Sequence, residues 1–111
     1  YCISGFVKDF VVDLRVGSPT YGKHLSIDLS SEKGNMIYIP QGMAHGFCSL
    51  SKTSILVYKA STIHHPNKDT GIKWDSAGIS WPNENMIISE RDKSFLKLKD
   101  FKSPFRFKKK L

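Results

Sequence analysis

The sequence has little cysteine and no long apolar run. Cys2 and Cys48 are the only cysteines among 111 residues, too few for the disulfide framework of a small secreted protein, so we expect a reducing compartment. No apolar run approaches the roughly 20 residues that a membrane-spanning helix needs. The first residues lack the charged and apolar regions of a secretory signal. We therefore expect a cytoplasmic globular protein with one domain.

The sequence also lacks internal repeats and any helical pattern of about 10 to 15 residues between strands, which excludes an alternating β-α-β fold. Short strands separated by Gly and Pro predict an antiparallel sandwich or barrel instead. A short helix is predicted to begin after Ser89, with Asp92 as the acid three residues on. The predicted strands are residues 7–15, 24–29, 36–39, 45–50 and 53–60.

The net charge of +7 is concentrated at one end. Residues 1–92 hold nine basic and nine acidic side chains, whereas residues 93–111, the basic tail, hold eight basic side chains and one acid. Four phenylalanines alternate with these lysines, a pattern that suits contact with nucleic acid or an anionic membrane. It suits equally a terminal segment whose aromatics cover the body while its lysines stay in water. We favour the second interpretation and expect neither nucleic acid nor membrane as a partner.

The first predicted strand carries carboxylates on one face. Alternate residues of a strand face opposite sides, so Asp9 and Asp13 share a face with Arg15. The opposite face is apolar and consists of Phe10, Val12 and Leu14. Either water solvates the carboxylates or they line a polar barrel interior, and the sequence does not decide between these alternatives. An interior carboxylate needs a partner, for which Arg15 is a candidate.

The most specific motif is IPQGMAHGF, residues 39–47. Its spacing of Pro40, Gly42 and His45 matches the Pro-x-Gly-x-x-His motif of cupin barrels, in which proline and glycine form a corner and the histidine enters the barrel. The segments around it extend the match. They are VVDLRVGSPTYG at 11–22, LSIDLS at 25–30, LVYKA at 56–60, ISWP at 79–82 and ISERD at 88–92.

In this order, the segments resemble the dTDP-4-dehydrorhamnose 3,5-epimerase family from Tyr1 to about Asp92. The resemblance implies an antiparallel, cupin-type jelly-roll barrel over residues 1–92. The basic tail, residues 93–111, has no clear counterpart in the family, and the short helix after Ser89 adds a helical segment near the C-terminus. Relatives have an earlier Arg-Gly-Leu-His segment that supplies the catalytic base, and this sequence has no match to it. We therefore expect the chain to correspond to the C-terminal portion of such an enzyme and to lack activity alone.

The implied reaction inverts carbons 3 and 5 of a dTDP-linked 4-keto-6-deoxyhexose, a step in dTDP-L-rhamnose and polysaccharide biosynthesis. Removing a proton beside a ketone requires a base, a stabiliser of the enolate and an acid on the opposite face. The resemblance implies an isomerase that is a homodimer and uses no cofactor and no metal. Adjacent His64 and His65 would point apart in an extended segment, which also argues against a metal site.

The resemblance assigns roles to six residues. Tyr58 matches the proton donor, and Asp92 matches the carboxylate that orients the catalytic base, with Asp9 as second choice for that carboxylate. His45, Asp69 and Arg91 match substrate contacts, although relatives have glutamate where this chain has Asp69. Without the resemblance, Tyr58 is explained as a core tyrosine and Asp92 as a carboxylate at a helix N-terminus. We expect Asp9, His45 and Tyr58 to line one barrel interior.

Three other functions remain open. The first is a related cupin that acts at one carbon or isomerises the ketone of a different nucleotide sugar. The second is a nucleotide-sugar binding module without activity, which would be favoured if no Arg-Gly-Leu-His-type segment lay upstream of Tyr1. The third is a binding protein whose barrel supports the basic tail.

Overall fold

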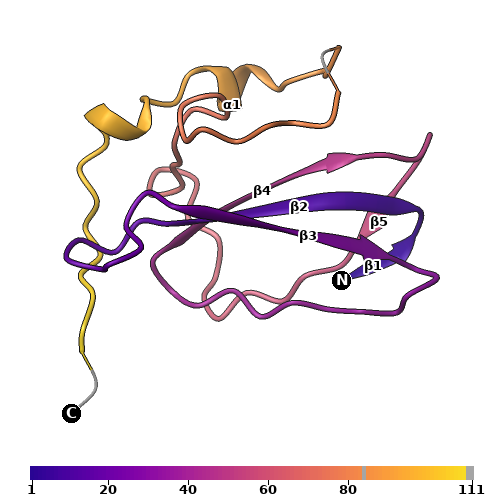
Figure 1. Cartoon of the computed structure of the whole chain (residues 1–111), viewed down its shortest axis with the longest axis horizontal. Helices are drawn as coiled ribbons and strands as arrows, with labels where there is room; N and C mark the ends of the chain where they lie inside the picture. Colours follow the sequence, from indigo (N-terminus) through magenta and orange to yellow (C-terminus); the bar gives the residue numbers. More distant parts are fainter. Residues whose placement is uncertain (84, 110–111) are drawn as a thin grey trace.

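The computed structural model describes residues 1–83 and 85–109, and in these residues strands predominate over helix. Every pair of named strands is antiparallel, in a three-stranded sheet of order β3-β2-β4 and a two-stranded sheet of β1 and β5 (Figure 1). The prediction of an all-β antiparallel fold with a short helix near the C-terminus is confirmed. The elements are β1 Cys2–Ser4, β2 Phe6–Asp13, β3 His24–Ser30, β4 Met43–Ser49, β5 Ile55–Leu56, α1 Glu90–Lys93 and the 3-10 helix η1 Leu98–Asp100.

β2 is the central strand, and both of its faces are buried. Val11 pairs with Leu25 of β3 on one side and with His45 of β4 on the other. β2 ends before the predicted limit at residue 15, because the amide of Leu14 donates instead to the carbonyl of Gly42 at 3.0 Å. The bond joins the end of β2 to the corner that precedes β4.

The polar face of β2 lies in the interior. Asp9 and Asp13 are only 2% and 4% exposed, so the alternative of a water-solvated face is wrong. Burial of a carboxylate is costly unless it is hydrogen-bonded. Each of these two therefore needs neighbours that offer donors.

Asp13 is bound by the turn that follows β2. Its carboxylate accepts hydrogen bonds from the guanidinium and backbone amide of Arg15, between 2.9 and 3.0 Å, and from the hydroxyls of Ser18 and Thr20 at 2.6 Å. These donors, the Arg15 guanidinium first, hold the pKa of Asp13 well below its usual range. The expectation that Arg15 partners a buried carboxylate is confirmed.

The apolar core lies against the β1–β5 ribbon. Cys2, Val7 and Leu29 form its buried centre, and Ile37 and Leu56 pack against it. Full burial of a side chain of this size contributes about 1.5 to 3 kcal/mol. The core fixes β1 and β5 beside the main sheet and holds part of the loop between β3 and β4.

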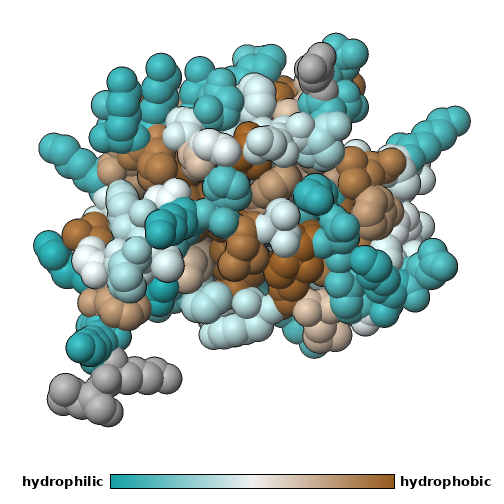
Figure 2. All heavy atoms as spheres, viewed as in Figure 1, coloured by the Kyte–Doolittle hydropathy of each residue, from teal (hydrophilic) through white to brown (hydrophobic). Residues whose placement is uncertain are grey.

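Two predicted strands differ from the structure. Residues 36–39 form no strand: Met36 and Tyr38 are 70% and 87% exposed, and only Ile37 packs against the core. The predicted strand 53–60 is reduced to Ile55–Leu56, because its partner β1 has three residues. Apolar side chains are exposed between hydrophilic ones on the face shown in Figure 2.

The basic tail, described as far as residue 109, includes the end of α1 and η1 and is extended beyond η1 (Figure 1). Its four phenylalanines are partly buried, and its lysines and Arg106 are exposed. Residues Phe105 and Phe107 bond through their backbones to Val16 at 2.8 and 2.9 Å. The expected arrangement, with aromatics inward and cations in water, is confirmed for these residues.

Candidate functional site

A cavity of about 900 Å³ lies between β4 and the cover segment, residues 69–83 and 85–95. This volume is within the range of small-ligand sites, about 300 to 1,000 Å³. Figure 1 shows the cover segment, with α1, along one side of β4. Four predicted site residues line the cavity: His45, Asp69, Arg91 and Asp92.

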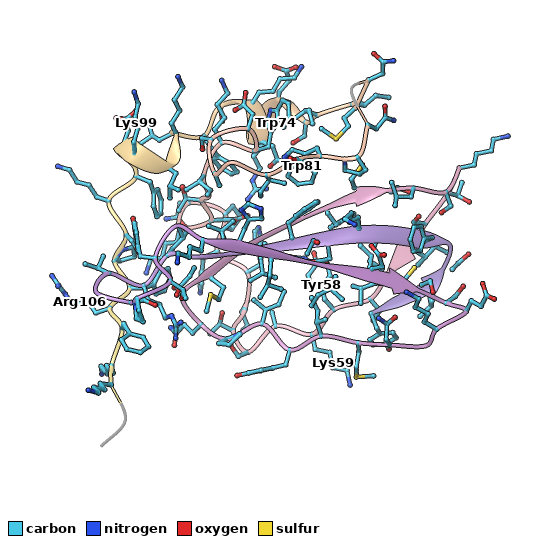
Figure 3. The ribbon with its side chains drawn as sticks, viewed as in Figure 1. Tyr58, Lys59, Trp74, Trp81, Lys99 and Arg106 are labelled. Atoms are coloured by element: carbon cyan, nitrogen blue, oxygen red, sulfur yellow. The ribbon has the colours of Figure 1, made fainter. Side chains whose placement is uncertain are left out.

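Aromatic packing holds the cover segment on the sheet. The ring of Trp81 lies 4.6 Å from that of Phe10 on β2 and 6.4 Å from that of Trp74, centroid to centroid. The indole N–H of Trp81 donates to the carbonyl of Trp74 at 2.9 Å, and both side chains lie above the sheet in Figure 3. Such aromatic pairs contribute about 0.5 to 1.5 kcal/mol beyond the area that they bury. They give the cavity a fixed apolar wall.

His45 lines the cavity and is paired with Asp9, which does not line it. The antiparallel register places both on one face of neighbouring strands, and Nε2 of His45 lies 2.7 Å from Oδ2 of Asp9. A carboxylate only accepts hydrogen bonds, so Nε2–H of His45 donates and Nδ1 remains for another partner. Oδ1 of Asp9 is buried and has no hydrogen-bond partner among the described residues. Both residues were expected in the barrel interior, but the sequence did not pair them.

Asp69, Arg91 and Asp92 form a second polar group. Nη2 of Arg91 lies 2.7 Å from Oδ2 of Asp69, and Nη1 lies 3.4 Å from Oδ1 of Asp92. The guanidinium also lies over the ring of Phe95, 4.9 Å from its centroid. Ser89 caps α1 as predicted, because its hydroxyl accepts from the amide of Asp92 at 3.1 Å. The cap fixes Arg91 and Asp92 at the cavity wall.

Tyr58 lies apart from these groups. It is 79% exposed and is not among the residues that line the cavity. Figure 3 shows it near Lys59 and away from Trp74 and Trp81. The expectation that Tyr58 lines an enclosed interior with Asp9 and His45 is therefore wrong for the described chain. The physical reason is that β5 ends at Leu56, so no ladder carries Tyr58 into the sheet.

Two lysines that the sequence did not single out also line the cavity. Lys52 follows β4, and Lys73 lies in the cover segment. Nζ of Lys73 lies 4.0 Å from Asp75. Neither lysine belongs to a motif, so only the fold brings these cations to the same cavity as Arg91.

The corner at Gly42 sets the start of β4 and so the position of His45. Gly42 has a φ of +94°, and a Cβ there would lie 2.6 Å from Cγ of Arg15 and 3.4 Å from Cβ of Phe105. A left-handed backbone and a contact this close both require glycine. The glycine of the cupin motif thus serves two physical needs.

Replacing Gly42 by alanine is expected to destabilise the chain by about 2 to 3 kcal/mol, through backbone strain and displacement of Arg15. Gly17→Ala is the matched control, because Gly17 has a φ of +88° but no described atom lies within 4 Å of the place that a Cβ would take. Gly17→Ala therefore measures the backbone strain alone, which is expected to cost about 1 kcal/mol of stability. Urea unfolding measures both, and equal losses would show that the contact with Arg15 is unimportant.

The described residues contain no group of three or more His, Cys, Asp or Glu side chains arranged to hold a metal ion. In the same part of the chain, no helix has the length and apolar character needed to cross a membrane.

Antiparallel sheets, a Pro-x-Gly-x-x-His corner and a cavity beside the motif strand define the class of protein as a cupin-type jelly roll. The chain belongs to the dTDP-4-dehydrorhamnose 3,5-epimerase family, whose model matches residues 1–100. The match includes the first residues of the basic tail. The family expected from the sequence motifs is confirmed.

Similar proteins agree with this assignment. The dTDP-4-dehydrorhamnose 3,5-epimerase of Sinorhizobium fredii is 40% identical over 111 residues, which cover 97% of this chain and 57% of the relative. The crystal structure of dTDP-6-deoxy-D-glucose-3,5-epimerase from Legionella pneumophila, in complex with dTDP-4-keto-L-rhamnose, matches with a TM-score of 0.92 and 32% identity, covering 97% of this chain and 60% of that one. A 3'-monoepimerase from Streptomyces bikiniensis, in complex with dTDP-quinovose, matches with a TM-score of 0.83 and 31% identity, covering 88% and 51%. The chain thus spans little more than half the length of these relatives.

Proposed function

We propose that this chain supplies the substrate-binding part of a dTDP-4-dehydrorhamnose 3,5-epimerase, an isomerase acting on a dTDP-linked 4-keto-6-deoxyhexose in dTDP-L-rhamnose biosynthesis. The observation that carries the proposal is the cavity of about 900 Å³ that His45 and Arg91 line together. The cavity combines an apolar aromatic wall with donors for a sugar and for a diphosphate. Similarity to proteins solved with dTDP-sugars supports the same substrate class.

In the proposed site, His45 and Arg91 bind substrate. Asp9 keeps the proton of His45 on Nε2, 2.7 Å away, so that Nδ1 is an acceptor for a sugar hydroxyl. Arg91 suits a phosphate group because its planar guanidinium offers several donors. Asp69 would contact the nucleotide from the same wall.

The proposed chemistry assigns catalytic roles to Tyr58, Asp92 and Asp9. A histidine base removes the proton beside the ketone, and a carboxylate behind it fixes its tautomer and stabilises the imidazolium. Asp92 is proposed for this carboxylate, with Asp9 as the second choice. Tyr58 is proposed to return a proton on the opposite face, which the enolate, a strong base, can accept from a phenol. The reaction requires no metal or redox cofactor.

A homodimer is part of the proposal. Several large hydrophobic side chains are exposed: Tyr38 is 87% exposed and Tyr58 is 79% exposed. A second copy or further chain would cover them. Closure over Tyr58 would also give the proton donor a dry environment. Both cysteines are free, which suits the proposed cytoplasmic location.

One alternative has a specific observation in its favour. The similarity to a 3'-monoepimerase of Streptomyces bikiniensis makes inversion at a single carbon the second candidate. Proton exchange at carbon 3 without exchange at carbon 5 identifies that activity.

Binding of dTDP tests the proposed site. His45→Gln is expected to weaken binding at least tenfold, because a hydrogen bond in the cavity is lost and Asp9 remains buried without its partner. The matched control is His65→Gln, which changes an exposed histidine outside the cavity and is expected to bind as the unchanged chain does. Isothermal titration calorimetry measures both. Equal affinities of all three proteins, or no dTDP binding by any of them, would contradict the proposal.

A further inference from the structure

Arg91 places a guanidinium in the wall of the cavity, and the carboxylates of Asp69 and Asp92 both contact it. Asp69 contacts Nη2 at 2.7 Å and Asp92 contacts Nη1 at 3.4 Å. Two negative charges therefore face one positive charge. A phosphate group that approached Arg91 in this arrangement would meet both carboxylates, and like charges at close range repel.

The two carboxylates contact Arg91 at different distances. Asp92 is the next residue in α1, and its carboxylate lies 3.4 Å from Nη1. Asp69 lies outside the regular elements, and its carboxylate lies 2.7 Å from Nη2 and 3.9 Å from Nδ1 of His64. Asp69 therefore makes the shorter of the two contacts with the guanidinium and is the stronger candidate to compete with a ligand for it.

The Asp69–Arg91 ion pair is also weak enough for a ligand to replace Asp69. The two side chains are 35% and 54% exposed, and pairs in such positions contribute about 0 to 1 kcal/mol. Arg91 keeps its position without Asp69, because its guanidinium also lies over Phe95 at 4.9 Å. A guanidinium stacked on a ring stays oriented and still offers its N–H groups at the edge.

We infer that Asp69 is a competitor for Arg91: its carboxylate occupies the guanidinium before a ligand binds, and a diphosphate group displaces it on binding. This inference deepens the proposed function and rests on it, since it takes the ligand to be a nucleoside diphosphate. After displacement, the carboxylate is free to accept a hydrogen bond from the nucleoside. The Asp69 side chain thus has a different partner in the free site and in the occupied site.

Pyrophosphate is the probe that tests the exchange, because it carries the diphosphate charge and has no nucleoside to contact Asp69. Asp69→Asn is expected to tighten pyrophosphate binding about three- to tenfold, because the variant removes both the competing partner and its charge. Asp69→Ser is a second variant with the same expectation. Isothermal titration calorimetry measures affinity, and circular dichroism confirms the fold.

Asp28→Asn is the matched control. It makes the same change of charge, but Asp28 pairs with Lys8 at 3.4 Å and neither residue lines the cavity. It is expected to leave pyrophosphate affinity unchanged, and Arg91→Gln added to Asp69→Asn is expected to remove the gain. The inference is overturned if Asp69→Asn weakens binding or leaves it unchanged, if Asp28→Asn tightens it equally, or if no variant binds pyrophosphate.

Failure of the inference is distinguishable from failure of the proposed function. If the chain binds dTDP but Asp69→Asn fails to tighten pyrophosphate, the nucleotide site stands and the competition is wrong. If Asp69→Asn tightens pyrophosphate and dTDP does not bind, the competition stands and the nucleotide-sugar substrate is wrong.

Discussion

The 111-residue chain, given dTDP-4-keto-6-deoxyglucose in deuterated water, is expected to exchange the protons at carbons 3 and 5 very slowly. The expected deficit is on the order of 10² to 10⁴ relative to a full-length relative such as the Sinorhizobium fredii enzyme, because that factor is typical of losing a general base. The chain has no match to the Arg-Gly-Leu-His segment that supplies the base in relatives. Nuclear magnetic resonance measures the exchange directly.

Rapid exchange by the chain alone would contradict this expectation and identify a base within it. The structure makes His45 the first candidate, since Asp9 lies 2.7 Å behind its ring as an orienting carboxylate does. His45→Gln would then stop the exchange. If it did not, the remaining candidates are His24, His64 and His65.

A chain extended at its N-terminus with the Arg-Gly-Leu-His segment of a relative tests the roles of base and acid separately. It is expected to exchange both protons, and Tyr58→Phe in it is expected to retain exchange while impairing inversion. Abstraction needs only a base and a stabilised enolate, whereas inversion also needs an acid on the opposite face. Loss of exchange in Tyr58→Phe would show that Tyr58 acts in abstraction instead.

Asp13→Asn is expected to lower the free energy of unfolding by about 3 kcal/mol at neutral pH, which corresponds to about 12 to 24 °C in Tm for a domain of this size. The substitution removes the charge that Arg15, Ser18 and Thr20 surround. Asp28→Asn is the control, since Asp28 forms a half-exposed pair with Lys8 at 3.4 Å and should cost about 0 to 1 kcal/mol. Equal losses in urea unfolding would contradict the assignment.

The same carboxylate makes stability depend on pH. The pKa of Asp13 is lower in the folded chain than its ordinary value of 3.8, so the unfolded chain takes up a proton first. Its contribution is complete above about pH 4 and is lost as pH falls further, towards the folded pKa. The unchanged chain should therefore lose more stability than Asp13→Asn below pH 4, and the two curves should converge. Parallel curves would show that Asp13 is not responsible.

The strands predicted best are those that have both an alternating sequence pattern and a neighbouring strand to pair with. β2, β3 and β4 lie within two residues of their predicted limits at every end, because alternation along β2 is matched by a strand on each side. Residues 36–39 have the composition of a strand but no neighbour with which to pair. Composition shows that a segment suits a sheet, but the segment forms a strand only if another backbone pairs with it.

The candidate site was predictable where a motif identified it. His45, Arg91 and Asp92 were expected from motifs and line the cavity. The pairing of Asp9 with His45 depends on the register of β2 and β4, which alternation alone does not give. The contact between Asp69 and Arg91 joins an irregular segment to α1, and no local pattern encodes such a contact.

The bonds that join residues 105–107 to Val16 have a consequence for the order in which the chain folds during synthesis. The Ser103 hydroxyl, which donates to the carbonyl of Leu14, is separated from it by 89 residues. At about 5 to 20 residues per second, the ribosome adds that stretch in about 4 to 18 s, whereas β-hairpins form within microseconds. β2, β3 and β4 can therefore pair long before the tail arrives. The corner that presents His45 is therefore secured late, so a chain truncated before residue 103 would keep the sheet but lose the bonds that hold the corner.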